Sequence, residues 1–273
     1  MPHPIRKSVH ALGVALPVLA CAGAAMAAAG DGAAERAARW QDVRQSVFGA
    51  RKVEAGTLVT IDMPARADDA SLVPVTLTVA DKDQVRGLYL IIDDNPAPLA
   101  AHVEFGPAGE PVQLRMRVRV NTYTNVHAVA ETADGRLVES EIFVKASGGC
   151  SAPMGMSDEE AMKGMGDMRM KFSGEAQAGK PVEATLMIRH PNFSGMQMNQ
   201  VTREYTPARY LDRISVSQGA RNVFTMEGDI SVSSNPVIGF AMRPEGAGPV
   251  KVAASDSQGG KWDHSFPVPA ASN

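Results

Sequence analysis

The segment 147–152, "SGGCSA", contains the residue most suited to covalent chemistry, the thiol of Cys150. A thiolate is an intrinsically strong nucleophile and needs mainly access to react. Gly148 and Gly149 remove side chains on one side and permit backbone angles that other residues resist. Ser151 and Ala152 keep the other side small. We therefore predict an exposed, flexible arm, with Cys150 as the site of covalent attachment and Gly148 and Gly149 as the source of its flexibility.

A catalytic role for this thiol is not favoured by the rest of the chain. After the first thirty residues the histidines are His102, His127, His190 and His264, and each falls in or beside a strand pattern. The sequence contains no HExxH motif, nucleophile elbow or Gly-rich phosphate loop. A nucleophile on a flexible arm would also lose the positioning that catalysis needs. We predict a carrier without catalytic residues, metal site or cofactor.

Methionines follow the cysteine at unusual density. They are Met154, Met156, Met162, Met165, Met168 and Met170, with Met196 and Met198 further on. Thioethers bind Cu(I), and Cys150 would add a soft ligand. The spacing of Met162, Met165 and Met168 suits one face of a helix. Methionine also serves as a flexible apolar filler, so a linker packed across two domains is the other interpretation.

The N-terminus has the pattern of an export signal. Arg6 and Lys7 precede the apolar segment 11–20, and "AGAAMAAAG" offers cleavage sites near Ala29. The apolar segment is too short for a stable membrane span. Lipid attachment at Cys21, in "VLAC", is an alternative. An exported protein usually pairs its cysteines, so the unpaired Cys150 predicts a reactive thiol or an intermolecular disulfide.

Charge and length restrict the class of partner and the number of domains. The formal net charge of the 273 residues is −3, and the basic residues are scattered along the chain. This pattern does not favour nucleic acid or a membrane surface as a partner. We predict a signal peptide at 1–29 and no membrane span in the mature protein, whose remaining length suffices for two domains.

Hydrophobic periodicity predicts a mostly β protein. Residues 33–48 have the spacing of a short amphipathic helix, after which the period changes to two. The segment 73–79 alternates in this way, as does 114–120, which places Arg115, Arg117 and Arg119 on the solvent face. "DDNPAP" and "ADGR" are turn signals. Several short strands at this spacing are typical of a β-sandwich.

The strand pattern stops at residue 146 and returns near 168. Ser157 and Glu160 form a capping box that predicts a short helix, which Gly164 and Gly166 would end. We predict a first sandwich at 30–146 that includes the N-terminal helix. An arm and Met-rich linker would follow at 147–167, and a second sandwich at 168–273.

Several motifs together resemble a known pair of proteins. The segment 122–150, "TYTNVHAVAETADGRLVESEIFVKASGGC", resembles the C-terminal part of SoxY, the sulfur-carrying subunit of bacterial thiosulfate oxidation, and 91–105 resembles a preceding hairpin of it. Residues 168–266 resemble SoxZ, chiefly in "ATLMIRHPNFSG" and "SSNPVIGFAMRP". The order is that of the fused SoxYZ-like carriers associated with quinoprotein dehydrogenases.

This resemblance implies two immunoglobulin-like sandwiches in a periplasmic, non-enzymatic sulfur carrier. Cys150 would hold the sulfur group. The implied partners are periplasmic sulfur-oxidation enzymes or a quinoprotein dehydrogenase system. The SoxY arm has two glycines after its cysteine, where this chain has Ser151 and Ala152, and here the arm is tethered at both ends. Two alternatives stay open: Cu(I) handling by Cys150 and the linker methionines, and a non-catalytic accessory module of a periplasmic dehydrogenase.

Overall fold

The computed structural model describes residues 21–177, 179–199, 202–246 and 248–269, and for residues 21–31 only the backbone. Most of the predicted signal peptide therefore lies outside the described residues, as does the side chain of Cys21. Residues Arg39–Asn273 form one compact unit, and the packing below concerns this unit. Within the described chain, no helix combines the length and apolar character needed to cross a membrane.

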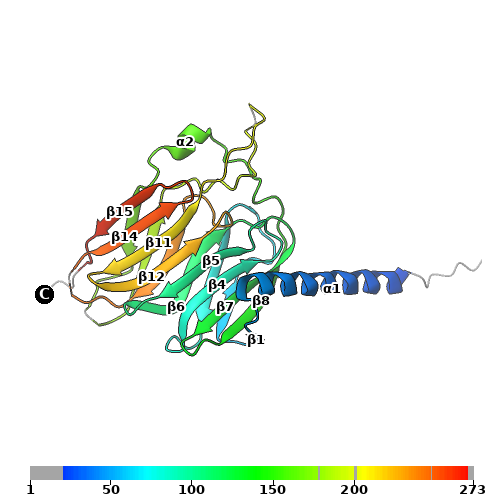
Figure 1. Ribbon diagram of the computed structural model, residues 1–273, viewed down its shortest axis with the longest axis horizontal. Helices are drawn as coiled ribbons and strands as arrows, with labels where there is room; N and C mark the ends of the chain where they lie inside the picture. The colour runs from blue at the N-terminus through cyan, green and yellow to red at the C-terminus, as the bar shows by residue number, and fades with distance from the viewer. Residues whose placement is uncertain (1–20, 178, 200–201, 247, 270–273) are drawn as a thin grey trace, which may run out of the picture. The chain divides into compact units, whose positions relative to one another are not determined.

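The prediction of a mostly β sandwich is confirmed (Figure 1). The chain up to Cys150 contributes helix α1 (Cys21–Phe48) and strands β1 (Val53–Ala55), β2 (Val59–Asp62), β3 (Val73–Val79), β4 (Val85–Ile92), β5 (Leu99–Phe105), β6 (Gly109–Val118), β7 (Thr124–Thr132) and β8 (Leu137–Val144). The remainder contributes helix α2 (Asp158–Met162) and strands β9 (Met168–Phe172), β10 (Val182–Ile188), β11 (Leu211–Gln218), β12 (Arg221–Gly228), β13 (Val237–Met242), β14 (Val250–Asp256) and β15 (Lys261–Phe266).

The two halves of the chain share both sheets. One sheet has the order β1-β8-β7-β4-β5-β12-β11-β14-β15 and the other β2-β3-β6-β13-β10-β9. The junctions are antiparallel pairs, β5 with β12 and β6 with β13. Backbone hydrogen bonds thus continue from the first half into the second in each layer. The sequence pattern did not reveal this continuity, because periodicity reports local structure and not strand partners.

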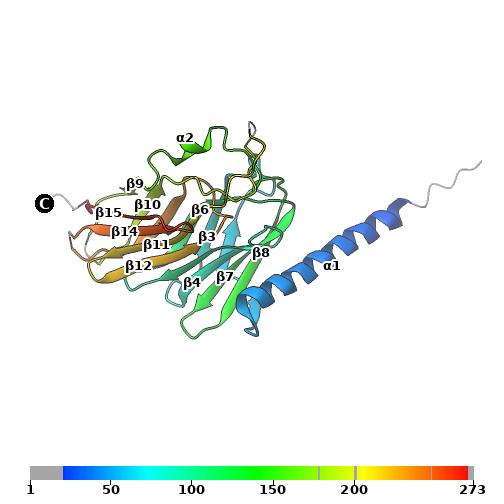
Figure 2. The same cartoon turned by 45° about the horizontal axis from the view of Figure 1, so that its top comes forward.

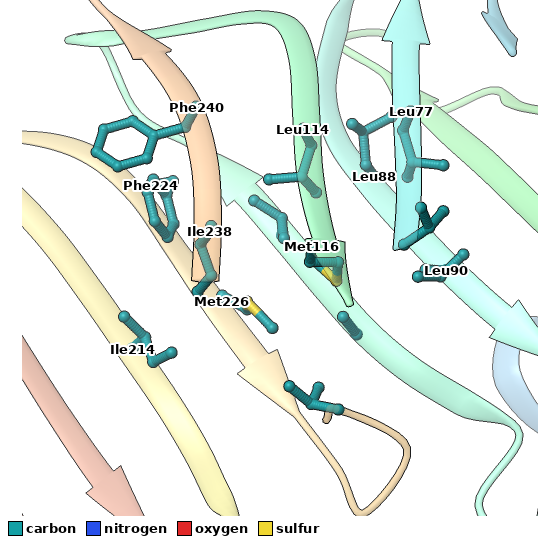
Figure 3. Close-up of a cluster of buried hydrophobic side chains, with 14 of the residues drawn as sticks. Leu77, Leu88, Leu90, Leu114, Met116, Ile214, Phe224, Met226, Ile238 and Phe240 are labelled. Atoms are coloured by element: carbon teal, nitrogen blue, oxygen red, sulfur yellow. The ribbon is translucent and has the colours of Figure 1, made fainter. Parts of the chain in front are cut away.

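Apolar side chains from both halves fill the space between the sheets (Figure 3). The drawn set joins Leu77, Leu88, Leu90, Leu114 and Met116 of the first half to Ile214, Phe224, Met226, Ile238 and Phe240 of the second. Strand β3 shows the underlying pattern, since its buried residues alternate with more exposed ones as predicted. Each fully buried side chain of this size contributes about 1.5–3 kcal/mol to folding.

The predicted N-terminal helix is present but starts earlier than expected, at Cys21, and ends at Phe48 as expected. Its Trp40, Val43 and Phe48 are buried in a second cluster with residues of β4, β7 and β8. The capping-box prediction is also confirmed, because the Ser157 side chain accepts a hydrogen bond from the backbone N–H of Glu160 at 3.2 Å.

Candidate functional site

Cys150 lies in a turn after β8 and is fully buried, with 0% of its surface exposed. The prediction of an exposed thiol on a loose arm is therefore wrong for this structure. The segment from Ala146 to Ser151 packs against the end of β6 and the chain that follows it. Local composition suggested exposure because glycines usually mark turns at the surface. It contains no information on which distant segments cover the turn.

The two glycines allow this close packing. The backbone N–H of Gly148 donates to the carbonyl of Asn121 at 2.7 Å, and that of Gly149 donates to Val120 at 3.1 Å. Gly148 has a φ of +75°, in the left-handed region. A Cβ on Gly149 would lie 2.0 Å from the carbonyl oxygen of Ala70. In this conformation the glycines thus hold the segment against the sheet, and the predicted flexibility is not seen.

The second half of the chain also holds the cysteine. Ser194 Oγ donates a hydrogen bond to the carbonyl oxygen of Cys150. The backbone N–H of Ser194 in turn donates to Gln197 Oε1 at 2.9 Å. Both residues belong to the connection after β10, which contains "HPNFSG", the end of the motif that resembles SoxZ. The turn that carries Cys150 is therefore hydrogen-bonded to both halves of the chain.

Arg119 is the charged residue next to the thiol. The prediction that it lies on the solvent face is wrong, since it is only 1% exposed. β6 ends at Val118, so the alternation that keeps Arg117 exposed no longer applies. Arg119 Nη2 donates to the carbonyl oxygen of Asn192 at 3.1 Å. Its Nε and Nη1 have no hydrogen-bond partner among the described residues.

Burial controls the titration of both groups. It raises the pKa of the Cys150 thiol to about 11, and the nearby Arg119 cation only partly opposes this. Burial likewise lowers the pKa of Arg119 to about 10, while Cys150 and Asp69 act in the other direction. At neutral pH the docked thiol is thus protonated and is a poor nucleophile, whereas Arg119 remains charged.

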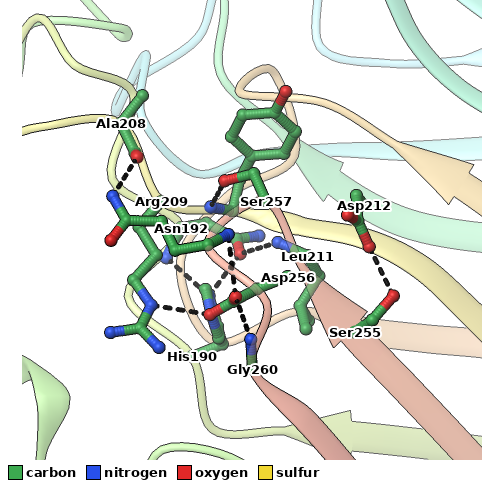
Figure 4. Close-up of polar contacts among 12 residues, drawn as sticks. His190, Asn192, Ala208, Arg209, Leu211, Asp212, Ser255, Asp256, Ser257 and Gly260 are labelled. Carbon is green, nitrogen blue, oxygen red and sulfur yellow. Dashed lines mark hydrogen bonds and ion pairs between the residues drawn. The ribbon is translucent and has the colours of Figure 1, made fainter.

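A buried polar network fixes Asn192, the residue that holds Arg119 (Figure 4). Asn192 Oδ1 lies 2.7 Å from His190 Nδ1 and accepts from the backbone N–H of Leu211 at 3.0 Å. His190 Nε2 lies 3.3 Å from Asp256 Oδ2, which also accepts from Arg209 Nε at 2.6 Å. Burial lowers the pKa of His190 in spite of the Asp256 carboxylate. The network thus fixes the part of the cysteine site that the second half of the chain contributes.

No histidine among the described residues pairs with the thiol. In the described part of the chain Cys150 forms no hydrogen bond or ion pair with an imidazole, and His190 reaches the site only through Asn192. His127 is buried elsewhere, 3.2 Å from Asp93 and stacked on Trp40. The described residues also contain no group of three or more His, Cys, Asp and Glu side chains suited to a metal ion.

The methionines are divided among different surroundings. The predicted helical face of Met162, Met165 and Met168 is wrong, because α2 ends at Met162 and Met168 belongs to β9. Met154, Met156 and Met198 instead line one cavity of about 520 Å³. It lies between the segment after Cys150 and the connection after β10, which run side by side in Figures 1 and 2.

Sequence reasoning found Cys150 and its glycines but missed Arg119, Asn192 and Ser194. Asn192 and Ser194 do fall in the motif "ATLMIRHPNFSG". The motif indicated a resemblance to SoxZ but assigned no function to either residue. Nothing in the sequence indicated that Arg119 is buried, since its place in an alternating run is typical of a solvent-facing residue.

Comparison with known proteins identifies both halves. The family model of the sulfur oxidation protein SoxY matches residues 44–150, and that of the sulphur oxidation protein SoxZ matches 169–267. The SoxY match ends on Cys150 itself. None of the curated proteins matches the chain.

Solved structures give weaker likenesses. The sulfur carrier protein SoxY from Chlorobium limicola f thiosulfatophilum is 25% identical over 41% of this chain and 94% of its own, with a TM-score of 0.34. A β-glycosidase from Bacteroides vulgatus is 9% identical over 77% and 24%, with a TM-score of 0.25. A putative membrane anchored protein from Corynebacterium diphtheriae is 12% identical over 81% and 61%, with a TM-score of 0.27. The two family matches together cover about three quarters of the sequence. The chain therefore belongs to the SoxYZ-like proteins, with a SoxY domain followed by a SoxZ domain in one polypeptide.

Proposed function

We propose that this protein is a periplasmic carrier that holds a sulfur-containing group covalently on Cys150 and presents it to partner enzymes. SoxY and SoxZ proteins take part in sulfur oxidation as carriers and not as catalysts, and they act with sulfur-oxidation enzymes. The observation that carries the assignment to one residue is the end of the SoxY match on Cys150, a free cysteine outside any strand.

The docked position of Cys150 requires that the carrier alternate between two states. In the closed state the thiol is buried and its raised pKa keeps it protonated. Loading and transfer then require the turn 146–151 to leave the sheet. The hydrogen bonds to be broken are few, namely those made by the amides of Gly148 and Gly149 and by the Ser194 hydroxyl, and Ala146 and Cys150 would also leave buried positions. The predicted flexible arm is thus proposed as the open state.

The proposal implies a definite result for protein isolated from its own periplasm. Intact-mass spectrometry of the native chain, before and after thiol reduction, should show added mass on Cys150 that reduction removes. The matched variant Cys150→Ser should have no such mass. An unmodified thiol that also refuses a sulfur group from thiosulfate or sulfide in the presence of sulfur-oxidation enzymes would contradict the carrier function. The same preparation establishes the N-terminus, and thereby tests signal cleavage near Ala29.

One observation favours a second candidate function. Met154, Met156 and Met198 line a single cavity next to the cysteine turn, and thioethers with a thiolate form a Cu(I) site. Titration with Cu(I) separates the two functions. Tight one-to-one binding that is lost in both Cys150→Ser and Met198→Leu would support copper handling, and binding unaffected by either variant would exclude this site.

A further inference from the structure

Arg119 is an exception among the buried charges of the described residues. The buried carboxylate of Glu131 pairs with Arg51 at 2.6 Å, and that of Asp256 pairs with Arg209 at 2.6 Å. Arg119 has no such partner in the described chain, and only its Nη2 donates a hydrogen bond. A buried cation with unpaired N–H groups costs several kcal/mol, so such groups are rare without a functional reason.

The unpaired guanidinium lies close to the cysteine site. Gly149 donates to Val120, the neighbour of Arg119, and Cys150 and Arg119 interact electrostatically. The same connection after β10 contacts both, through Asn192 at Arg119 and Ser194 at Cys150. Nε and Nη1 of Arg119 are therefore the unpaired N–H groups near the sulfur that remain available to a group attached to it.

We propose that Arg119 binds the negative charge of the group carried on Cys150 and thereby keeps the loaded turn closed. This inference rests on the proposed carrier function and applies to a cargo whose free end is anionic. The anionic end of the adduct accepts hydrogen bonds from the free N–H groups of Arg119. Asn192 holds the guanidinium in place through Nη2.

The charge on the cargo then sets the opening equilibrium. With a neutral thiol, closure leaves Arg119 buried and uncompensated, apart from the longer-range attraction of the exposed Asp69. With an anionic adduct, closure forms a charge-assisted contact in a buried site, where such contacts are strongest. The empty turn opens more easily to accept a group, and the loaded turn shields its adduct from solvent.

Two alkylating reagents test the effect of a negative charge on the Cys150 adduct without a sulfur-containing cargo. Iodoacetate converts the Cys150 thiolate to the carboxymethyl thioether, and iodoacetamide converts it to the nearly isosteric carbamidomethyl thioether. In each reaction the thiolate sulfur bonds to carbon and iodide leaves with the bonding electron pair. Hydrogen exchange of the Gly148 and Gly149 amides, which in the closed state donate to Asn121 and Val120 outside the turn, then reports opening. We expect exchange to be about tenfold slower in the carboxymethyl form, as a charge-assisted contact predicts.

Variants assign this difference to one residue. In Arg119→Gln the carboxymethyl and carbamidomethyl forms should exchange at the same rate, whereas in the matched control Arg117→Gln, an exposed arginine two residues earlier, the difference should persist. Equal exchange of the two forms in the wild-type chain overturns the proposal, even if Arg119→Gln does not fold. A difference that persists in folded Arg119→Gln overturns it as well.

An adduct that contains sulfur tests whether the same charge effect applies to the proposed cargo. Cys150 thiolate attacks an inner sulfur of tetrathionate, which forms the cysteine S-thiosulfonate and releases thiosulfate. This form should match the carboxymethyl protein in its slowed exchange. A thiosulfonate form that exchanges like the carbamidomethyl form overturns the anion-binding role of Arg119 and leaves the carrier function intact. Native protein that never carries sulfur on Cys150 contradicts the carrier function, while the charge dependence measured with iodoacetate remains a separate result.

Discussion

Ser194 Oγ donates a hydrogen bond to the carbonyl oxygen of Cys150, so the SoxZ domain holds the cysteine with which the SoxY match ends. Ser194 is 4% exposed, and this contact is therefore formed away from solvent. In separate subunits such a contact would depend on association. In the fused chain it is intramolecular, and it makes closure of the turn a property of both domains.

Removal of this hydroxyl should favour the open state. A buried hydrogen bond contributes about 1 kcal/mol, so we expect Ser194→Ala to increase the rate of Cys150 alkylation by iodoacetamide about fivefold. The rate is measured by mass spectrometry at fixed pH. Ser255→Ala is the matched control, because it removes a serine hydroxyl bonded to Asp212, between β14 and β11. Equal rates in Ser194→Ala and wild type would show that the serine does not hold the turn.

Gly149→Ala should prevent docking of the turn altogether. The added Cβ would lie 2.0 Å from Ala70 O and 2.6 Å from Val120 O, and both are backbone atoms that cannot move aside cheaply. The released thiol should regain an ordinary pKa near 8.5, so its alkylation at neutral pH should accelerate by at least about tenfold. Gly174→Ala is the control, since no atom lies within 4 Å of its added Cβ. Slow alkylation in folded Gly149→Ala would contradict the close packing described above.

The contrast between β3 and the buried pair Cys150 and Arg119 shows which features of the fold the sequence predicts and which it does not. The buried and exposed positions of β3 follow directly from alternation within Val73–Val79, because a strand on a sandwich has one buried face. Cys150 and Arg119 were both predicted at the surface, and both are buried by segments distant in sequence. The residue type at Cys150 identified the chemistry, whereas its burial depends on tertiary packing that no local pattern contains.

Deprotonation of His127 should lower the stability of the protein at alkaline pH. Burial disfavours its charged form, but Asp93 at 3.2 Å and Glu139 at 3.4 Å raise its pKa to about 9. An unfolded histidine has a pKa near 6.5. Since the folded pKa is the higher one, this stabilisation is fully present below pH 6.5 and is lost as the pH rises through 9.

The expected loss is roughly 3 kcal/mol in the free energy of unfolding, which urea denaturation at pH 6 and pH 9.5 measures. His127→Gln should remove this part of the pH dependence, whereas His264→Gln, on edge strand β15, should retain it. A pH dependence that is the same in wild type and His127→Gln would show that His127 is not protonated in the folded state.

The shared sheets predict that the SoxY half is not stable by itself. A fragment of residues 30–157 would expose the edges of β5 and β6, which pair with β12 and β13 in the whole chain. It would also expose apolar residues that pack against Phe224 and Phe240. Unpaired strand edges beside apolar surface promote aggregation. We expect the fragment to aggregate alone and to become soluble when it is co-expressed with residues 158–273, as light scattering and gel filtration measure. A soluble monomeric fragment with native-like β content would show that the first sandwich folds independently and that strand pairing between the halves is dispensable.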